Sequence, residues 1–160
     1  MNQKSIVAKE AVVNEVYELA KEHQAVIVFE YHGLSVAKIT ELRRLLRADG
    51  SSMAIYKNSL VERAVEKLGK PELNEYLKGP NAFLFSKDVS SGAKVLTRFA
   101  RLNDEVEIKG GLFEDRVVGA DQVRAISKLP NRDGMISMFL SVLNAPIQKF
   151  AATVKAVAEK

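Results

Sequence analysis

The 160-residue sequence contains no cysteine and no tryptophan, and it has only two histidines and four prolines. Without cysteine the chain cannot form disulfides, hold zinc through thiolates or use a thiolate nucleophile. No apolar run approaches the roughly 18 residues that a membrane-spanning helix needs. The N-terminal residues lack the apolar stretch and small-residue cleavage site of a secretory signal. We therefore expect a cytoplasmic protein without membrane association.

Signatures of catalysis are equally sparse. The two histidines, His23 and His32, show no His-Glu-x-x-His spacing, and neither a Walker phosphate loop nor a Gly-x-Gly-x-x-Gly sequence occurs. Ser35 and Lys38 match the Ser-x-x-Lys pattern of some acyl enzymes, but the companion motifs are absent. A helix-capping role explains Ser35 better. We expect no enzymatic activity, no metal site and no cofactor, because no catalytic or ligand set can be assembled from these residues.

Hydrophobic residues make up 47% of the chain and charged residues 28%, a balance typical of a folded domain. At this length a chain can bury its own core. Lys and Arg number 24 against 20 Asp and Glu, which gives a net charge of +4. This mild excess is compatible with a nucleic-acid partner, so the positions of the charges are more informative than their total.

Hydrophobic periodicity predicts alternating strands and helices. Strands are expected at 25–29, 53–56, 81–85 and 106–113, and helices at 4–22, 36–49, 59–68, 90–102 and 120–128, with a brief helical insert between Pro71 and Gly79. Without that insert the order becomes the β-α-β-β-α-β of a ferredoxin-like split sheet. We therefore predict an α+β fold built on this sheet with extra helices. A Rossmann-like parallel sheet is the alternative.

Two of the predicted helices have a clear apolar side. We expect the inward-facing residues to be Val36, Ile39, Leu42, Leu45 and Leu46 in one helix and Val95, Leu96, Phe99 and Leu102 in the other. Pro130 cannot continue the helix before it. Residues 1–130 are therefore expected to form the compact domain, and residues 131–160 a C-terminal kinked helical extension.

The C-terminal extension contains two copies of an 11-residue unit, in which the matching apolar residues are Ile136 and Ile147, Phe139 and Phe150, and Leu143 and Val154. Eleven residues are about three helical turns, so both copies present the same face. Asn144-Ala-Pro146 is expected to interrupt the helix, with Pro146 kinking it, before helix resumes from Ile147 to Glu159.

The extension either folds back on the domain as an ordinary amphipathic helix or is covered by other chains. The repeated face favours the second interpretation, because a single core contact needs no repeat. The residues expected to contact the partner chains are Ile136, Phe139, Leu140, Leu143, Ile147, Phe150, Ala151, Val154 and Val157.

Basic residues are concentrated between residues 38 and 63, where six of them lie among three acidic residues. Arg43 and Arg47 are four residues apart and share a helix face. Clustered Lys and Arg are the electrostatic footprint of nucleic-acid binding, although a solvated helix face gives the same pattern.

The segment after Lys57 carries a second signal. Ser59-Leu-Val-Glu62 has the spacing of a capping box, so Ser59 is expected to cap a helix. The free N–H groups of that helix start, with Lys57 and Arg63 nearby, would suit a phosphate. Gly33 is expected to let two backbone segments approach closely. An ordinary capped turn is the alternative interpretation.

Several separated motifs resemble one family in their order along the chain. They are Phe29-Glu-Tyr-His-Gly-Leu-Ser-Val36, Thr40-Glu-Leu-Arg-Arg44, Tyr56-Lys-Asn-Ser-Leu60, Gly79-Pro-Asn-Ala82, Lys109-Gly-Gly111, Leu129-Pro-Asn-Arg132 and Ala145-Pro146. Together they resemble the bacterial ribosomal stalk-base protein of the large subunit, the L-ten family, over essentially the whole chain.

This resemblance implies a domain docked on large-subunit ribosomal RNA beside the L-eleven protein. It also implies a C-terminal helix that carries dimers of the L-seven/L-twelve stalk protein, which recruit translational GTPases. Two 11-residue units predict two dimers. By position, Gly33, Lys57, Asn58 and Ser59 match the RNA-facing motif, with Arg43 and Arg63 beside them. His32 stands where the family usually has arginine.

A small RNA-binding regulator with a self-dimerising tail is the alternative to the ribosomal interpretation. It would use the same basic segment and the same apolar helix, so composition and periodicity do not separate the two.

Overall fold

The computed structural model describes residues 3–114 and 116–158, without the side chains of residues 3–6 and 132. The chain divides into two compact units, Met1–Lys128 and Leu129–Lys160. The domain boundary that we expected at residue 130 falls in the short connection between helix α5 (Ala120–Ile126) and helix α6 (Arg132–Ala158).

The first unit is built on a five-stranded antiparallel sheet with the order β2-β3-β1-β4-β5. The strands are β1 (Ala25–Glu30), β2 (Ser52–Ala54), β3 (Asn81–Ser86), β4 (Glu107–Phe113) and β5 (Arg116–Gly119). The order β2-β3-β1-β4 is that of two interleaved split β-α-β units, which confirms the ferredoxin-like prediction. The Rossmann-like alternative is wrong, because each strand runs antiparallel to its neighbours.

Two strands differ from the sequence prediction. Strand β5 was missed: it forms a hairpin with β4, and its residues Arg-Val-Val-Gly show no alternation of apolar and polar side chains. Strand β2 has only three residues, so Ile55 and Tyr56 lie in the loop after it. The Tyr56 ring instead packs at tilted and edge-on angles against Phe83 and Phe85.

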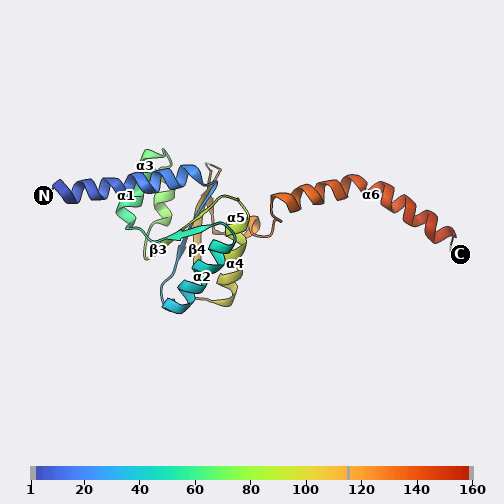
Figure 1. Cartoon of the computed structure of the whole chain (residues 1–160), viewed down its shortest axis with the longest axis horizontal. Coiled ribbons are helices and arrows are strands. Elements are labelled where there is room, and N and C mark those ends of the chain that lie inside the picture. The colour runs from blue at the N-terminus through green and yellow to red at the C-terminus, as the bar shows by residue number, and fades with distance from the viewer. Residues whose placement is uncertain (1–2, 115, 159–160) are drawn as a thin grey trace. The chain divides into compact units, whose positions relative to one another are not determined.

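Helices cover both faces of the sheet because alternate strand residues are apolar on both sides. Ala25, Ile27 and Phe29 of β1 face one core, and Val26 and Val28 face the other. The first core is covered by α2 (Val36–Ala48), α4 (Ser91–Leu102) and α5, and the second by α1 (Gln3–Glu22), α3 (Asn58–Lys67) and the 3-10 helix η1 (Pro71–Tyr76), as Figure 1 shows.

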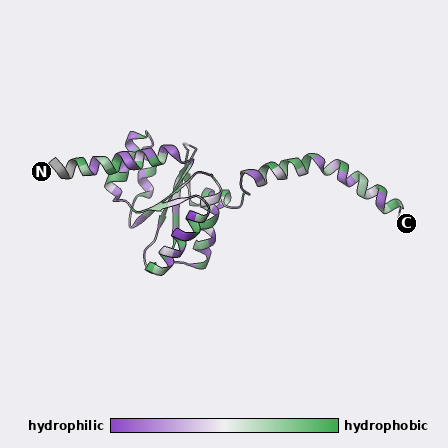
Figure 2. Ribbon diagram, in the orientation of Figure 1, coloured by the Kyte–Doolittle hydropathy of each residue, from purple (hydrophilic) through white to green (hydrophobic). Residues whose placement is uncertain are grey.

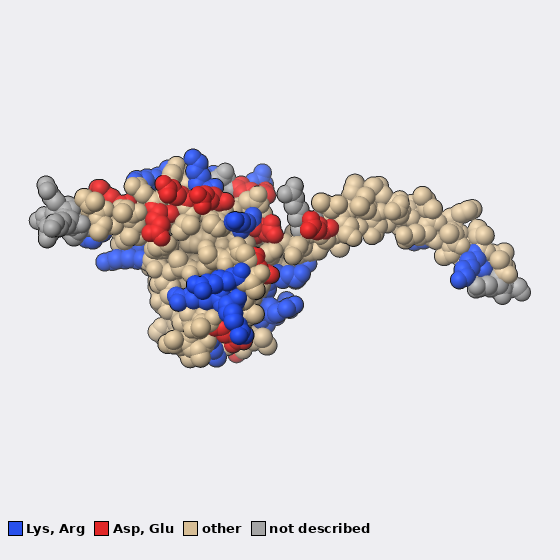
Figure 3. Space-filling model, in the orientation of Figure 1, with Lys and Arg blue, Asp and Glu red and all other residues tan. Residues whose placement is uncertain are grey.

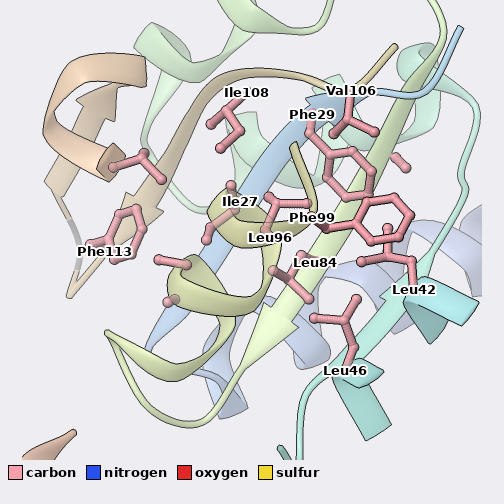
Figure 4. Close-up of a cluster of buried hydrophobic side chains, with 14 residues drawn as sticks. Ile27, Phe29, Leu42, Leu46, Leu84, Leu96, Phe99, Val106, Ile108 and Phe113 are labelled. Carbon is pink, nitrogen blue, oxygen red and sulfur yellow. The ribbon is translucent and has the colours of Figure 1, made fainter. Parts of the chain in front are cut away.

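The first core is the one drawn in Figure 4, where Ile27 and Phe29 of the sheet meet Leu42, Leu46 and Leu96 of the helices. All five side chains are fully buried. Burying each such side chain contributes roughly 1.5–3 kcal/mol. This core therefore fixes α2 and α4 on the sheet.

Three residues expected to face inward are exposed. Val36 and Leu102 have exposed fractions of 80% and 79%, and Leu45 has 40%. Val36 is the first residue of α2 and Leu102 the last of α4, so both project at helix ends rather than over the core. Leu45 is one helical position, about 100°, from the buried Leu46.

The second unit contains one long helix, α6, which runs without a break through Pro146. The interruption predicted at Asn144–Pro146 is therefore wrong: the proline removes one backbone hydrogen bond, and the ribbon of α6 curves gently in Figure 1. The predicted helix end at Glu159 lies outside the described residues. Within the residues that the structure describes, no helix is long and apolar enough to cross a membrane.

The burial difference on α2 gives a matched test of the core. Leu42→Ala should lower the free energy of unfolding by about 2–5 kcal/mol, because it removes a fully buried side chain and leaves a cavity. Leu45→Ala makes the same chemical change at a 40% exposed position and should cost clearly less. Urea denaturation of both variants measures the difference, and equal losses would contradict the assigned helix face.

Candidate functional site

Four loops gather at one end of the sheet. Strands β1 and β2 are both antiparallel to β3, so their C-terminal ends lie beside the N-terminal ends of β3 and β4. This end, which we call the loop end, carries residues 31–35, 55–57, 77–80 and 103–106. Gly33, Lys57, Asn58 and Ser59, which are distant in sequence, are brought to the same end by this topology.

Gly33 is required for its backbone angle and not for a close approach. Its φ is +85°, a region that other residues rarely adopt. A Cβ atom built there would come no closer than 3.9 Å to Glu105 Cγ, which is ordinary contact. The expectation that Gly33 lets two backbone segments approach closely is therefore wrong.

The start of α3 differs from the predicted capping box. Lys57 is the N-cap residue, and among the described residues it makes no side-chain hydrogen bond that caps the helix. Ser59 lies within the first turn and is exposed, so its predicted capping role is wrong. The first turn of α3 is left with backbone N–H groups and positive potential at the loop end.

Asn58 has a structural role in addition to its place at this surface. Its Nδ2 donates to Leu77 O at 2.6 Å and to Gly79 O at 2.8 Å. These two hydrogen bonds tie the start of α3 to the loop before β3. The Asn58 side chain therefore fixes where Lys57 and Ser59 sit.

Lys109 holds the same loop from the other side. The strand register shifts between Val28 and Phe29, which leaves Lys109 as the extra residue of a β-bulge in β4. Its Nζ donates to Lys78 O and pairs with Glu30, both at 2.5 Å, and it reaches Asn81 Oδ1 at 3.2 Å. The bulge thus turns a cation into the loop end.

A groove lies between α1 and α3 and contains three of the predicted RNA-contacting residues, Lys57, Ser59 and Arg63. Lys9 and Lys67 also line it, together with Glu10 and Asn14. Lys67 donates to Asn14 Oδ1 at 3.0 Å, which bridges the two helices. The groove is rich in cations whose side chains are exposed.

Sequence reasoning missed two of these cations. Lys67 is four residues after Arg63, so helical spacing was a signal that could have identified it. Lys9 comes from α1, and only the packing of α1 against α3 brings it to the groove.

Tyr56 links α1 to the loop before α3. Its hydroxyl donates to Glu15 Oε1 at 3.0 Å. Partial burial, the hydrogen bond to Glu15 and the charge of that carboxylate together raise the pKa of Tyr56 from 10.0 to about 12. These surroundings favour the protonated hydroxyl, which is the form that donates to Glu15.

Arg43 and Arg47 are not part of this groove. They lie exposed on α2, which covers the opposite face of the sheet. Among the described residues neither arginine forms an ion pair. The basic segment that is continuous in sequence is thus divided between two faces of the domain.

The apolar face of α6 is exposed in the second unit. The exposed fraction is 65% for Phe139 and 71% for Phe150, and every described residue predicted to contact partner chains is exposed: Ile136, Leu140, Leu143, Ile147, Ala151, Val154 and Val157 as well. Figure 2 shows apolar residues recurring along the whole helix. Because the helix is unbroken, the 11-residue spacing keeps both copies on one side.

Two family models match segments of this chain. A family model described as ribosomal protein L10 matches residues 4–101, and one described as the C-terminal region of ribosomal protein uL10 matches residues 129–160. The chain belongs to the ribosomal protein L10 family. Two relatives, the large ribosomal subunit protein uL10 of Bacillus cereus strain B4264 and that of Bacillus anthracis strain CDC 684 / NRRL 3495, are each 47% identical over 158 residues, 98% of this chain and 95% of theirs.

Membership of the L10 family makes the chain a structural constituent of the large ribosomal subunit in bacteria. The family is one of ribosomal structural proteins and not of enzymes. The L-ten resemblance drawn from the motifs is therefore confirmed.

The structural roles of Asn58 and Ser59 can be tested together. Asn58→Ala should lower the free energy of unfolding by about 1–3 kcal/mol, because it leaves two loop carbonyl groups without their donor. Ser59→Ala should stay within about 0.5 kcal/mol of the wild type, since Ser59 caps nothing. Thermal and urea unfolding measure the stability of both variants. A large loss of stability in Ser59→Ala would show that Ser59 does cap α3.

Proposed function

We propose that this protein is the anchor of the ribosomal stalk. Its first unit binds large-subunit ribosomal RNA, beside the L-eleven protein, and α6 carries two dimers of the L-seven/L-twelve stalk protein. The protein is then ribosome-bound in the bacterial cytoplasm. The observation that carries the proposal is the exposed, repeated apolar face of α6.

The face of α6 needs a partner for a physical reason. A row of large apolar side chains from Ile136 to Val157 is more than half exposed. Keeping this apolar surface in contact with water is unfavourable. Amphipathic helices bury such rows by pairing with helices of another chain. Two equivalent 11-residue units offer two equivalent docking places, which supports a stoichiometry of two dimers.

The RNA part of the proposal rests on the exposed cations of the first unit. The residues that we propose as contacts are Gly33, Arg43, Arg47, Lys57, Asn58, Ser59 and Arg63, with Lys9 and Lys67 added from the groove. Lys57 and Arg63 can neutralise phosphates, while Gly33 shapes the 31–35 loop and Asn58 fixes the start of α3. Contacts of this kind determine where and how tightly the RNA binds, but they do not read its base sequence.

The two functions combine through multivalency. A domain fixed on RNA and a helix carrying several stalk dimers raise the local concentration of translational GTPases without a tighter single contact. The protein itself positions its partners and carries the charge that binds RNA. GTP hydrolysis is carried out by the translational GTPases that the stalk dimers recruit.

The stalk assignment predicts a defined stoichiometry. Native mass spectrometry of the full chain with the purified stalk protein should show two partner dimers, and a chain ending at residue 145 should bind one while keeping its RNA affinity. Phe150→Asp should also cost one dimer. Ala152→Asp, about 200° away from Phe150 around the helix, is the control and should keep both. A self-dimer of α6 in place of stalk dimers would instead favour the RNA-binding regulator.

The RNA assignment predicts a change in salt dependence. Combining Lys57→Ala with Arg63→Ala should lower the slope of log affinity against log salt by about 1.5, since each lost phosphate contact is worth roughly 0.7–0.9. Filter binding to deproteinised large-subunit RNA at several salt concentrations measures the slope. Lys21→Ala with Lys87→Ala, two exposed lysines outside the groove, is the control. An unchanged slope in the first variant would remove Lys57 and Arg63 from the interface.

A further inference from the structure

The two helix layers of the first unit differ in charge. On one face of the sheet, α2 has four basic residues and one acidic, α4 has three basic and none acidic, and α5 has one of each. On the other face the sequence of α1 has three basic and four acidic residues, α3 two of each, and η1 two acidic and none basic. Figure 3 shows basic side chains over α2 and acidic ones along α1. The layer of α2, α4 and α5 is the one that attracts a polyanion.

Helix α4 carries the most one-sided charge of this layer. Its basic residues Lys94, Arg98 and Arg101 are all exposed and recur at helical spacing, so they form a ridge on one side. None of the three forms an ion pair with another described residue. Their charge is therefore not neutralised within the part of the chain that the structure describes.

Beside this ridge, a groove runs between α4, α5 and β4. Its floor includes the buried side chains of Val106 and Ile108. Its polar lining residues are three cations, Arg101, Arg124 and Lys128, two carboxylates, Asp104 and Glu107, and Thr97. Arg124 is only loosely paired with Asp121, at 3.8 Å. The groove lining is net positive.

Thr97 supplies a second, independent sign of a ligand. Its exposed fraction is 8%, and its Oγ1 is buried without a hydrogen-bond partner in the part of the chain that the structure describes. A helical threonine ordinarily bonds back to a carbonyl group one turn earlier, and a buried hydroxyl without any partner is unfavourable. A hydroxyl in this state can donate to an anionic oxygen that enters the groove.

We propose that the groove between α4 and α5 binds a phosphate group of the RNA backbone, with Thr97 Oγ1 as donor and Arg101, Arg124 and Lys128 as its cations. This inference rests on the proposed RNA-binding function and extends the RNA contact to the face that carries Arg43 and Arg47. The RNA then meets the first unit through the α2, α4 and α5 layer as well as through the loop end.

Filter binding of the full chain to deproteinised large-subunit RNA tests the site. The triple variant Arg101→Gln, Arg124→Gln and Lys128→Gln should lose at least tenfold in affinity, and its salt slope should fall by about 2. The charge-matched control Lys21→Gln, Lys87→Gln and Arg116→Gln alters three exposed cations outside the groove and should stay near the wild type. Equal losses in the two triples would overturn the proposal, because only net charge would matter.

Thr97→Val separates a ligand contact from a structural one. Valine keeps the shape and removes a hydroxyl that has no partner among the described residues, so the melting temperature should hold or rise while RNA affinity falls several-fold. A lower melting temperature, or unchanged RNA affinity, would overturn the role of Thr97.

The controls also separate this inference from the proposed function. If the wild type shows no salt-dependent RNA binding, the proposed function fails. If it binds and the Lys57 and Arg63 variant weakens it while the α4–α5 triple matches its control, only the phosphate site fails. A triple that binds RNA normally but no longer assembles into large subunits would assign the groove to a protein partner, which also contradicts the proposal.

Discussion

Strand β1 is the constraint on which the first unit depends. Its side chains alternate between two buried cores, so the strand requires helices on both faces of the sheet. Three helices cover each face, and charges that are neighbours in sequence are separated as a result. Arg43 and Arg47 lie on α2, on one face of the sheet. Lys57 and Arg63 lie at the start of α3 and within it, on the other face. The electrostatic character of each surface follows from how the core is built.

The loop end shows how partly exposed polar contacts hold a surface in place. Asn58 and Lys109 come from different sides of the 77–80 loop and both bond to its carbonyl groups. The bulge in β4 is what turns Lys109 toward Glu30 and Asn81. Such contacts keep the start of α3 in one position, so the cations beside it are presented at fixed places to a ligand.

The second unit differs from the first in where its apolar residues lie. The first unit buries its apolar residues internally, whereas α6 repeats an apolar face that a single helix cannot cover by itself. Pro146 lies inside this helix without ending it, so the two 11-residue copies stay in phase. The protein is thus divided into a unit with a buried core and a helix with an exposed apolar face.

Much of this protein could be predicted from local pattern. Strands β1, β3 and β4, most of the helices, the apolar repeat of α6 and the family motifs are carried by residues close together in sequence, where periodicity and spacing act. The hairpin strand β5 showed no alternating pattern, and Ser59 satisfied a capping motif that the backbone did not adopt. The groove of Lys9 with Arg63, the contacts of Asn58 and the buried hydroxyl of Thr97 depend on segments that meet only on folding. Sequence determined which residues were available, and packing alone decided which of them share a surface, because contacts between distant segments follow from the core and not from spacing along the chain.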